Sequence, residues 1–320
     1  MYDVVALGEL LVDFTDHGVS GQGNPLFEAN PGGAPRNVLA MLAKFGKKTA
    51  FIGKVGNDMF GRLLKRKIED AGIAAKELKE DPEVNTTLAF IHTLPDGDRE
   101  FSFFRNPGAD RMLREEEVNA ELIQNAEIFH FGTLSMTHEG VRAATRKAAE
   151  TAKKSGCLIS FDPNLREALW ESLELAREQI LYGIQMCDIL KISDNEIRFL
   201  TGKEDCEEGI ACLRNQYPIP LVLLTRGKYG SIAYYKHLRT EEQGFQVHAT
   251  ETTGAGDTFF GCCLAYILEH DFQTLTERNL HEMLLLANAG AALITTRKGA
   301  LCVMPEKEEI LKLIQETSRT

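Results

Sequence analysis

The stretch TTGAGDTFF, residues 252–260, places two glycines directly before a helical pattern. An alternating run at 244–250 predicts a strand just before it, and apolar residues recur at helical spacing from Phe259 to Leu268. Glycine leaves backbone N–H groups uncovered, and such groups at a helix N-terminus attract anions. This part of the chain is therefore predicted to form a strand, a loop that can bind an anion, and a helix.

Asp257 lies in the first turn of that predicted helix, where the helix dipole favours a carboxylate. A base beside an anion-binding loop is what phosphoryl transfer to an alcohol requires, because the hydroxyl loses its proton while negative charge spreads over oxygens. The alternative is an ordinary helix start, in which Asp257 is a first-turn acid and the glycines serve only the turn.

The flanking chain alternates between strands and helices, which predicts an α/β fold with a central, mainly parallel sheet flanked by helices. Short apolar runs predict the strands, and helical spacing that ends at a glycine, as at Gly46 and Gly72, predicts helices. The predicted strands are 4–7, 49–55, 128–131, 158–161, 189–192 and 221–224, followed by a hairpin over 231–247, and the predicted helices are 37–45, 59–71, 138–154, 173–184, 196–200, 207–217, 279–295 and 306–314.

A hairpin signal breaks this alternation, with a turn at 95–98 between two alternating runs, 86–94 and 99–105. Together with the polar segment 13–30 it could form a small separate sheet that covers a pocket as a lid. The alternative is an extension of the main sheet at its edge. We expect a single domain over residues 1–320, with a β lid formed by about 11–31 and 85–107.

The composition excludes several classes of protein. Lys and Arg number 36 against 47 Asp and Glu, a net charge of −11, which disfavours non-specific binding to nucleic acid. The seven cysteines are scattered without paired spacing, as expected of free thiols in a reducing cytosol rather than of disulfides or a zinc site. The sequence shows neither a signal peptide nor an apolar run of membrane-spanning length. We therefore expect a cytoplasmic protein that binds no membrane.

Several polar residues fall just past predicted strand ends, where open parallel sheets bind their ligands. Arg166 could clamp a transferring phosphoryl group or a sugar hydroxyl, or it could form a structural ion pair with Asp162. Glu196 could orient the waters of a magnesium ion, or it could simply begin a helix. The residues at these predicted strand ends are Asp13, Asn37, Asp162, Asn164, Glu196, Thr225 and Asp257.

Two further segments have two interpretations each. The turn that contains Thr225, Gly227 and Gly230 could let a nucleotide base and ribose approach the backbone, or it could be only a tight hairpin turn. Phe103 and Arg105 alternate to one face of the predicted hairpin, so they either cover a substrate or pack in the core.

Two motifs together resemble those of the PfkB carbohydrate kinases, the ribokinase-like family: PGGAPRN at 31–37, similar to the family's sugar site, and TTGAGD at 252–257, similar to its catalytic signature. The resemblance runs from Gly8 to the C-terminal helices. It implies a ribokinase-like three-layer sandwich that phosphorylates a sugar with ATP and Mg²⁺. The chain belongs to a soluble enzyme on this reading, with a sugar and ATP as its small-molecule partners and a homodimer through the lid as a further expectation.

Other motifs are most similar to the fructokinase branch of the family. They are RNPGAD at 105–110, DPNLR at 162–166, and KISD at 191–194 leading to FLTG at 199–202. The reaction that the resemblance implies is ATP plus D-fructose to ADP plus fructose 6-phosphate.

The resemblance also implies a role for individual residues. Asp257 would be the general base, with the amides of Gly254, Ala255 and Gly256 as the anion hole and Arg166 near the γ-phosphate. The sugar site would comprise Asp13, Gly32, Gly33, Asn37 and Asn164, with Arg105 reaching in from the lid beside Phe103. The nucleotide and magnesium side would comprise Lys191, Ser193, Glu196, Thr225, Gly227, Gly230 and Asn288.

The sequence departs from the family pattern at three positions. Ser193 stands where the family pattern has asparagine, and fructokinases tend to share this departure. Family members often bind a monovalent cation such as K⁺ near the catalytic loop, which here implies Glu251 and Thr253, although Glu251 replaces the usual Asp. Arg36 replaces a small residue beside the sugar site. It could favour an acidic or already phosphorylated substrate, or it could point to solvent.

Other functions stay open from the sequence. A kinase of the same fold could act on 2-keto-3-deoxygluconate, ribose or a nucleoside. A non-catalytic sugar-binding regulator on the same scaffold would have no need of the base Asp257. A dinucleotide-dependent oxidoreductase would want its glycine fingerprint after the first strand, and the glycines here lie elsewhere.

Overall fold

The computed structural model describes residues 1–93, 99–297, 299 and 303–317. A nine-stranded sheet forms the centre of this described part. Its strands are β1 (Tyr2–Leu7), β4 (Thr49–Gly56), β5 (Ile73–Asp81), β8 (Ala126–Gly132), β9 (Leu158–Asp162), β10 (Ile189–Ser193), β11 (Leu221–Thr225), β12 (Ser231–Tyr235) and β13 (Leu238–Glu242). The strand order is β13-β12-β11-β10-β9-β8-β1-β4-β5. Neighbouring strands from β5 to β11 pair in parallel, and β12 pairs antiparallel with both of its neighbours. The predicted central, mainly parallel sheet is confirmed.

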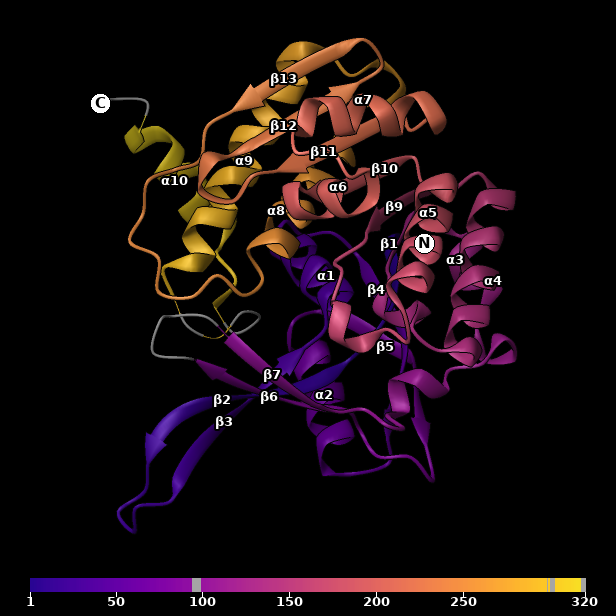
Figure 1. Cartoon of the computed structure of the whole chain (residues 1–320), viewed down its shortest axis with the longest axis vertical. Helices are drawn as coiled ribbons and strands as arrows, with labels where there is room; N and C mark the ends of the chain where they lie inside the picture. Colours follow the sequence, from indigo (N-terminus) through magenta and orange to yellow (C-terminus); the bar gives the residue numbers. More distant parts are fainter. Residues whose placement is uncertain (94–98, 298, 300–302, 318–320) are drawn as a thin grey trace.

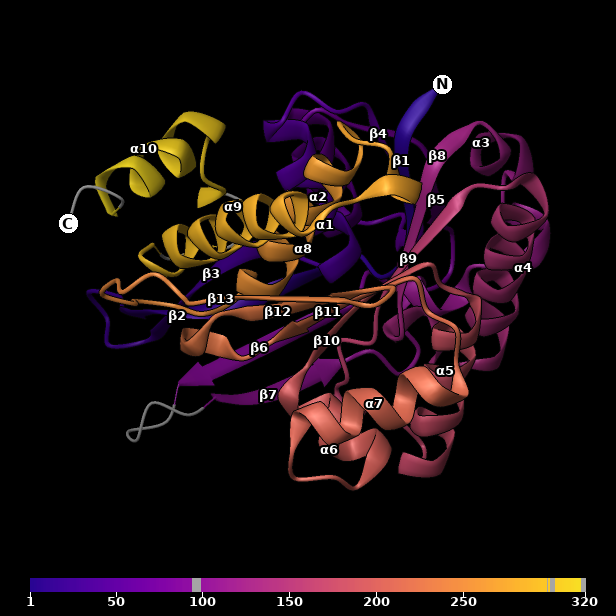
Figure 2. The same cartoon turned by 90° about the horizontal axis from the view of Figure 1, so that it is seen from above.

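Helices cover both faces of this sheet, as Figure 2 shows. The alternation of β1 explains why two layers are needed: Val4 and Ala6 enter one buried cluster, while Val5 and Leu7 enter the other. One layer holds α1 (Ala34–Lys44), α2 (Met59–Asp70), α8 (Ala255–Ile267), α9 (Glu277–Thr295) and α10 (Lys307–Thr317), and the other holds α3 (Ala120–Gln124), α4 (Glu139–Ser155), α5 (Leu173–Met186), α6 (Asp194–Thr201) and α7 (Cys206–Gln216). In the described residues, no helix is both long and apolar enough to span a bilayer.

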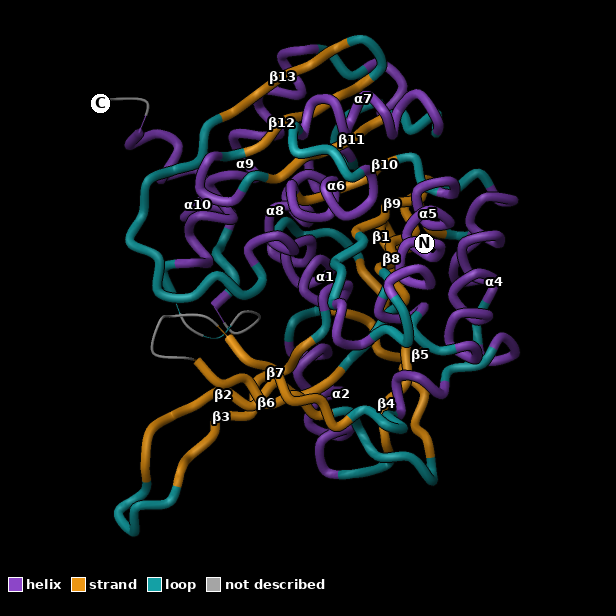
Figure 3. The backbone as a smooth tube through the Cα atoms, in the orientation of Figure 1, coloured by secondary structure: helices purple, strands orange, loops and turns teal. Residues whose placement is uncertain are grey.

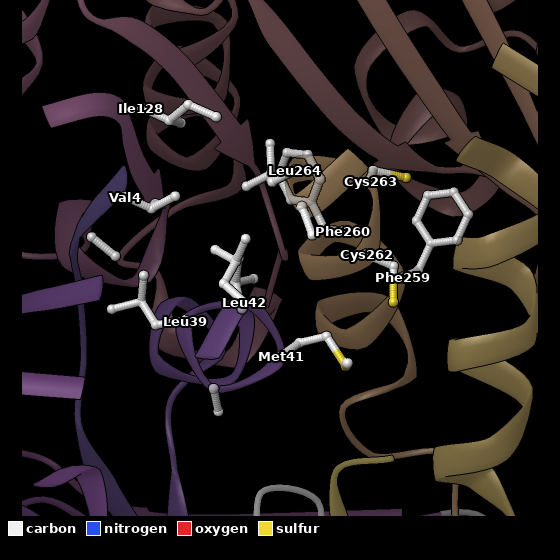
Figure 4. Close-up of a cluster of buried hydrophobic side chains, with 14 of the residues drawn as sticks. Val4, Leu39, Met41, Leu42, Ile128, Phe259, Phe260, Cys262, Cys263 and Leu264 are labelled. Atoms are coloured by element: carbon white, nitrogen blue, oxygen red, sulfur yellow. The ribbon is translucent and has the colours of Figure 1, made fainter. Parts of the chain in front are cut away.

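Helices α1 and α8 pack closely against each other although the sequence separates them widely (Figure 4). Leu42 of α1 and Phe260 and Leu264 of α8 belong to one buried cluster. Gly261 permits the close approach, since a Cβ there would lie only 2.6 Å from the Cβ of Met41. This contact brings the beginnings of the two helices to the same end of the sheet.

A second sheet of four strands lies apart from the main one (Figures 1 and 3). Its strands are β2 (Leu11–Val19), β3 (Pro25–Gly32), β6 (Leu88–Thr93) and β7 (Arg99–Phe104), in the order β3-β2-β6-β7. The predicted small separate sheet is present, and the alternative of an extension of the main sheet is wrong. The turn predicted at 95–98 lies outside the described residues.

Two local predictions are wrong. The run 244–250 forms no strand, because the β12–β13 hairpin already ends the sheet, and Thr250 N–H instead donates to Thr295 O of α9 at 2.7 Å. Asp13 does not follow a strand end but lies inside β2, because the chain turns out of the main sheet after β1 and enters the second sheet at once. The edge strand β5 has no counterpart among the predicted strands.

Candidate active site

A cavity of about 280 Å³ lies between the second sheet and the beginnings of α1 and α8. The second sheet contributes Leu11, Asp13, Ile91 and Phe103; the start of α1 contributes Gly33, Ala34 and Asn37; the start of α8 contributes Thr252, Thr253, Gly254, Gly256 and Asp257; the remaining walls are Glu9, Leu134, Asn164, Arg166 and Lys191. Segments from both ends of the chain and from the second sheet therefore face one small space.

Asn37 and Asp257 meet at the floor of this cavity. The Asn37 Nδ2 donates to Asp257 Oδ2 at 2.7 Å across 220 positions of sequence, and both side chains are buried. Burial raises the pKa of Asp257, while the hydrogen bond from Asn37 and the positive charge of Lys191 oppose the rise. The carboxylate at this position is a stronger base than an exposed aspartate, which suits proton abstraction from an alcohol.

The loop before α8 has the geometry of an anion site. Gly254 is the N-cap of α8 with a left-handed φ of 78°, which a glycine adopts without strain. The first N–H groups of a helix have no acceptor within it, so the N–H groups in the first turn of α8 lie at the end of the helix that borders the cavity. The Ala255 N–H donates to Thr252 O at 3.3 Å and Ala255 does not line the cavity, whereas Gly254 and Gly256 do.

The N-terminal glycine pair fits closely against the carboxyl group of Asp13 and the backbone carbonyl of Glu9. A Cβ on Gly32 would lie 2.3 Å from Asp13 Oδ2, and a Cβ on Gly33, whose φ is 129°, would lie 2.4 Å from Glu9 O. Glu9 Oε1 accepts the Ala34 N–H at 2.7 Å and so fixes the first turn of α1. Burial raises the pKa of Asp13 to about 6 and that of Glu9 to about 7. Sequence reasoning missed Glu9.

Asp162 pairs with Lys191, so the predicted alternative of an Asp162–Arg166 ion pair is wrong. The Lys191 Nζ lies 3.1 and 3.0 Å from the two carboxylate oxygens of Asp162. Arg166 instead donates to the Leu165 carbonyl and lines the cavity. Its guanidinium remains available to a ligand because it is solvent-exposed.

Arg105 does not reach into the cavity as predicted. Its guanidinium is buried and donates to Asp110 at 2.8 Å, to Thr137 Oγ1 at 3.0 Å and to Leu134 O at 2.9 Å. Asp110 also accepts from Thr87 Oγ1, which precedes β6. Arg105 therefore anchors the base of the second sheet, because its donors are already used there. Gly32 too is not on the cavity wall but lies behind Leu11 and Asp13, which are.

Of the predicted nucleotide residues, Lys191 lines the cavity. The others lie outside its wall, most of them at the carboxyl ends of β10 and β11. Ser193 and Glu196 form a capping box at the start of α6, and Glu196 also accepts the Leu165 N–H at 2.9 Å. Asn288 of α9 accepts from Ser231 Oγ at 2.9 Å and donates to the carbonyls of Glu242, the last residue of β13, and Gln243. Thr225, Gly227 and Gly230 form the turn between β11 and β12.

The described residues do not form a metal-binding cluster of three or more His, Cys, Asp or Glu side chains. Both carboxylate oxygens of Glu196 accept hydrogen bonds from the protein. Glu251, the candidate ligand for a monovalent cation, accepts the Gly299 N–H at 3.1 Å. Because these carboxylates already accept hydrogen bonds from the protein, they do not fit direct coordination of Mg²⁺.

Arg36 is completely buried, so the predicted alternative that it points to solvent is wrong. It lies in the first turn of α1, and its Nη2 donates to Pro31 O at the end of β3. Its charge also opposes the rise in the pKa of Asp13 caused by burial. Arg36 thus links the second sheet to the helix that carries Asn37.

The fold and the site define a small-molecule kinase: a parallel sheet covered on both faces, with a buried carboxyl group and a helix N-terminus at one cavity. The model of the pfkB family of carbohydrate kinases matches residues 1–307. The chain belongs to this family, which confirms the resemblance found in the sequence.

Individual relatives match this chain over nearly its whole length. The chain is 42% identical to a fructokinase of Zea mays over 315 residues, which is 98% of each protein. A fructokinase structure from Xylella fastidiosa with bound ATP superposes with a TM-score of 0.88 at 29% identity, covering 99% of this chain and 100% of that one. A double mutant of a Vibrio cholerae fructokinase, solved with fructose, ADP and a potassium ion bound, gives a TM-score of 0.87 at 29% identity over 98% of each chain.

Proposed function

We propose that this carbohydrate kinase transfers the γ-phosphate of ATP to the 6-hydroxyl of D-fructose. The observation that carries the proposal is the contact between Asn37, in the sugar motif, and Asp257, in the catalytic motif. The 42% identity between this chain and a fructokinase of Zea mays, over 98% of the chain, also supports the proposal. One hexose can touch both side chains at once, because they already touch each other.

In the proposed reaction Asp257 takes the proton of the sugar hydroxyl as its oxygen attacks the γ-phosphorus. The bond from the γ-phosphorus to the bridging oxygen breaks, and ADP leaves with that electron pair. The N–H groups of Gly254 and Gly256 at the start of α8 receive the negative charge that develops on the phosphoryl oxygens, and Arg166, which also lines the cavity, binds those oxygens.

The sugar contacts that we propose are those whose side chains line the cavity. Asp13, Asn37 and Asn164 offer polar groups to hydroxyls, and Gly33 lets the sugar approach the backbone. Phe103 from the second sheet gives an apolar cover, so that the sheet acts as a lid that excludes water during transfer. Arg105 supports the lid at its base rather than binding the sugar.

We assign the nucleotide to the carboxyl ends of β10 and β11, beside Ser193, Thr225, Gly227, Gly230 and Asn288. Mg²⁺ would arrive with the nucleotide, held by phosphate oxygens and water, with Glu196 near its water shell. When bound, this ion offsets phosphate charge. A monovalent cation near Glu251 and Thr253 is part of the proposal, by analogy with the potassium-bound Vibrio cholerae structure.

The proposal is tested by steady-state kinetics of purified protein with ATP across D-fructose, ribose, 2-keto-3-deoxygluconate and a nucleoside. We expect the highest kcat/KM with fructose, and ADP release that depends on the sugar. A large preference for another of these substrates would contradict the fructose assignment, and ADP release unaffected by any sugar would contradict the kinase mechanism. Replacing K⁺ by Na⁺ in the same assay tests the monovalent cation.

We further propose a homodimer that forms through the outer face of the second sheet. Phe27 and Phe104 are 46% and 63% exposed there, and each ring contacts Phe90. Exposed aromatic side chains that cluster on one face are typical of interaction surfaces. Sedimentation velocity should show a dimer that Phe104→Glu dissociates, and a monomeric wild-type protein would contradict this.

The free thiols among the described cysteines support the expected cytoplasmic location.

A further inference from the structure

We propose that Asp162 is a positioning residue that holds the Lys191 ammonium at the boundary between the sugar cavity and the anion loop, where Lys191 acts on the transferring phosphoryl group. The inference rests on the proposed phosphoryl transfer and assigns to Asp162 a role that the sequence did not suggest. Its basis is the placement of one buried cation between a carboxylate and the start of α8.

The geometry of the pair is set by two neighbouring strands. Asp162 is the last residue of β9, Lys191 lies in β10, and the two strands pair in parallel just before these positions, at Phe161 and Leu190 (Figure 1). Both side chains are buried, and Nζ lies 3.1 and 3.0 Å from the two carboxylate oxygens. Because both oxygens contact the same nitrogen, the carboxylate fixes where the ammonium stands.

The ammonium also stands against the anion loop. A Cβ on Gly256 would lie 3.1 Å from Lys191 Nζ, and Lys191 lines the cavity together with Gly254, Gly256 and Asp257. A phosphoryl group cradled by the N–H groups at the start of α8 would therefore meet this cation. A glycine at 256 leaves the approach open, since any side chain there would press on Nζ.

A buried ion pair usually contributes little net stability, because desolvation of both charges offsets their attraction. A pair placed at the wall of a polar cavity has a different use, because an incoming anion can share the cation. The other ionisable groups around Lys191 do not replace Asp162: Glu196 is held by Ser193 and the Leu165 N–H, Asp257 by Asn37, and buried His130 by Ser160 with its pKa lowered to about 3.

The charge state of Lys191 depends on these carboxylates. Burial alone lowers the pKa of a lysine, but Asp162 and Glu196 more than offset this and raise the pKa of Lys191 above its usual value. The wild-type ammonium therefore keeps its proton at alkaline pH. In the proposed step Lys191 transfers no proton: the sugar proton goes to Asp257, the new O–P bond forms, the bond to ADP breaks, and the fixed positive charge offsets the charge on the phosphoryl oxygens.

Asp162→Asn tests the inference through the pH dependence of kcat. We expect a fall in kcat of about 10 to 100-fold at pH 7.5, smaller than the 10²–10³-fold typical of losing a donor that contacts the transition state directly, and little change in the KM for the sugar. The variant should also lose activity as pH rises, because Lys191 without its carboxylate releases its proton at a lower pH. Wild type should show no such alkaline decline before pH 9.

Replacing Lys191 by arginine, whose charge does not titrate in this pH range, separates this role of Asp162 from a purely structural one. Asp162→Asn combined with Lys191→Arg should abolish the alkaline decline, because arginine stays charged. Asp188→Asn is the matched control: Asp188 accepts the Ile159 N–H at the opposite end of the same strand pair and should leave the pH profile unchanged. An Asp162→Asn enzyme with the wild-type kcat and pH profile would overturn the inference.

Lys191→Met provides a second route if Asp162→Asn does not fold. We expect it to lose at least 100-fold in kcat while calorimetry still detects ATP binding, and near-normal turnover would overturn the inference. If wild-type protein prefers a sugar other than fructose, the fructose assignment fails, but the same variants decide the role of Asp162 with that sugar.

Discussion

At the scale of single residues, the site depends on one buried carboxyl group. Asp257 is surrounded by groups that either favour its charge, such as Asn37 and Lys191, or oppose it, as burial does. Burial wins, so the carboxyl group is a better base than an exposed one while its hydrogen bond still orients it. This balance is typical of a catalytic carboxylate in a small closed site.

Replacing Asp257 by Asn should remove the base and leave the pocket almost unchanged in volume. We expect kcat to fall by about 10²–10⁴-fold, the usual contribution of general acid–base catalysis, with sugar and ATP still bound. Stopped-time assays of fructose phosphorylation and calorimetric titration of both substrates measure the two effects. A variant with near-normal turnover would remove Asp257 from the mechanism.

The pH dependence follows from the raised pKa of the same group. A base must be deprotonated to act, so kcat should fall as pH drops through the pKa of Asp257, which lies above the ordinary value of 3.8. Asn37→Thr removes a hydrogen bond that stabilises the charged form, and should move this acid limb to higher pH. An acid limb that stays in place would show that Asn37 does not tune the base.

Sequence reasoning found most of these residues because they lie within short motifs at element boundaries. Glu9 escaped it, because its partner is the Ala34 amide 25 positions away, and no local pattern tells a buried carboxyl group of this kind from an exposed one. Arg105 was misplaced for a related reason: each nitrogen of a guanidinium can donate, and the sequence does not say that Nε, Nη1 and Nη2 donate to Asp110, Thr137 and Leu134.

At the scale of elements, the contact between α1 and α8 sets the distance between Asn37 and Asp257. Each of these residues precedes its helix-contact residue, Met41 or Gly261, by one helical turn. The parallel strands were predictable, since strands buried on both faces are continuous apolar runs. The run 244–250 misled because its alternation reflects packing of Phe245 against the core rather than pairing with a neighbour.

Gly261→Ala should destabilise the protein by about 1–3 kcal/mol, the usual cost of an extra methyl group in a packed interior. The added Cβ would lie 2.6 Å from Met41 Cβ and push α8 from α1, so kcat should fall too. Urea unfolding and kinetics measure the two effects. Gly140→Ala is the control, because its Cβ would meet no atom closer than 3.8 Å; equal stability of both variants would contradict the close-packing argument.

At the scale of the whole molecule, the chain leaves the main sheet for the second sheet twice, after β1 and after β5, and returns each time. The cavity lies between the second sheet and the beginnings of α1 and α8. Leu11, Ile91 and Phe103 of the second sheet close one side of it. The sheet was predictable as a separate unit from its hairpin signals. That it could cover a pocket was one of two interpretations of the sequence. The contacts that hold it there were not predictable, because they depend on Asp110, which joins Thr87 before β6 to Arg105 after β7.

Deleting residues 93–98 should shorten the β6–β7 hairpin and admit water to the site. We expect a higher ratio of ATP hydrolysis to sugar phosphorylation, because water then competes as the phosphoryl acceptor. Coupled assays of ADP and of phosphorylated sugar measure the ratio. Shortening the exposed turn 20–24 between β2 and β3 is the control and should not change it. An unchanged ratio in the deletion variant would contradict the lid role.

The hydrogen bond that spans 220 positions, from Asn37 to Asp257, also bears on how the enzyme is made. During synthesis Asn37 leaves the ribosome long before Asp257. A nascent or prematurely terminated polypeptide that lacks Asp257 therefore cannot consume nucleotide, however well its first strands and helices have folded. Two separately expressed fragments, divided between these positions, would regain turnover only on reassembly, which makes this chain a natural reporter of complementation.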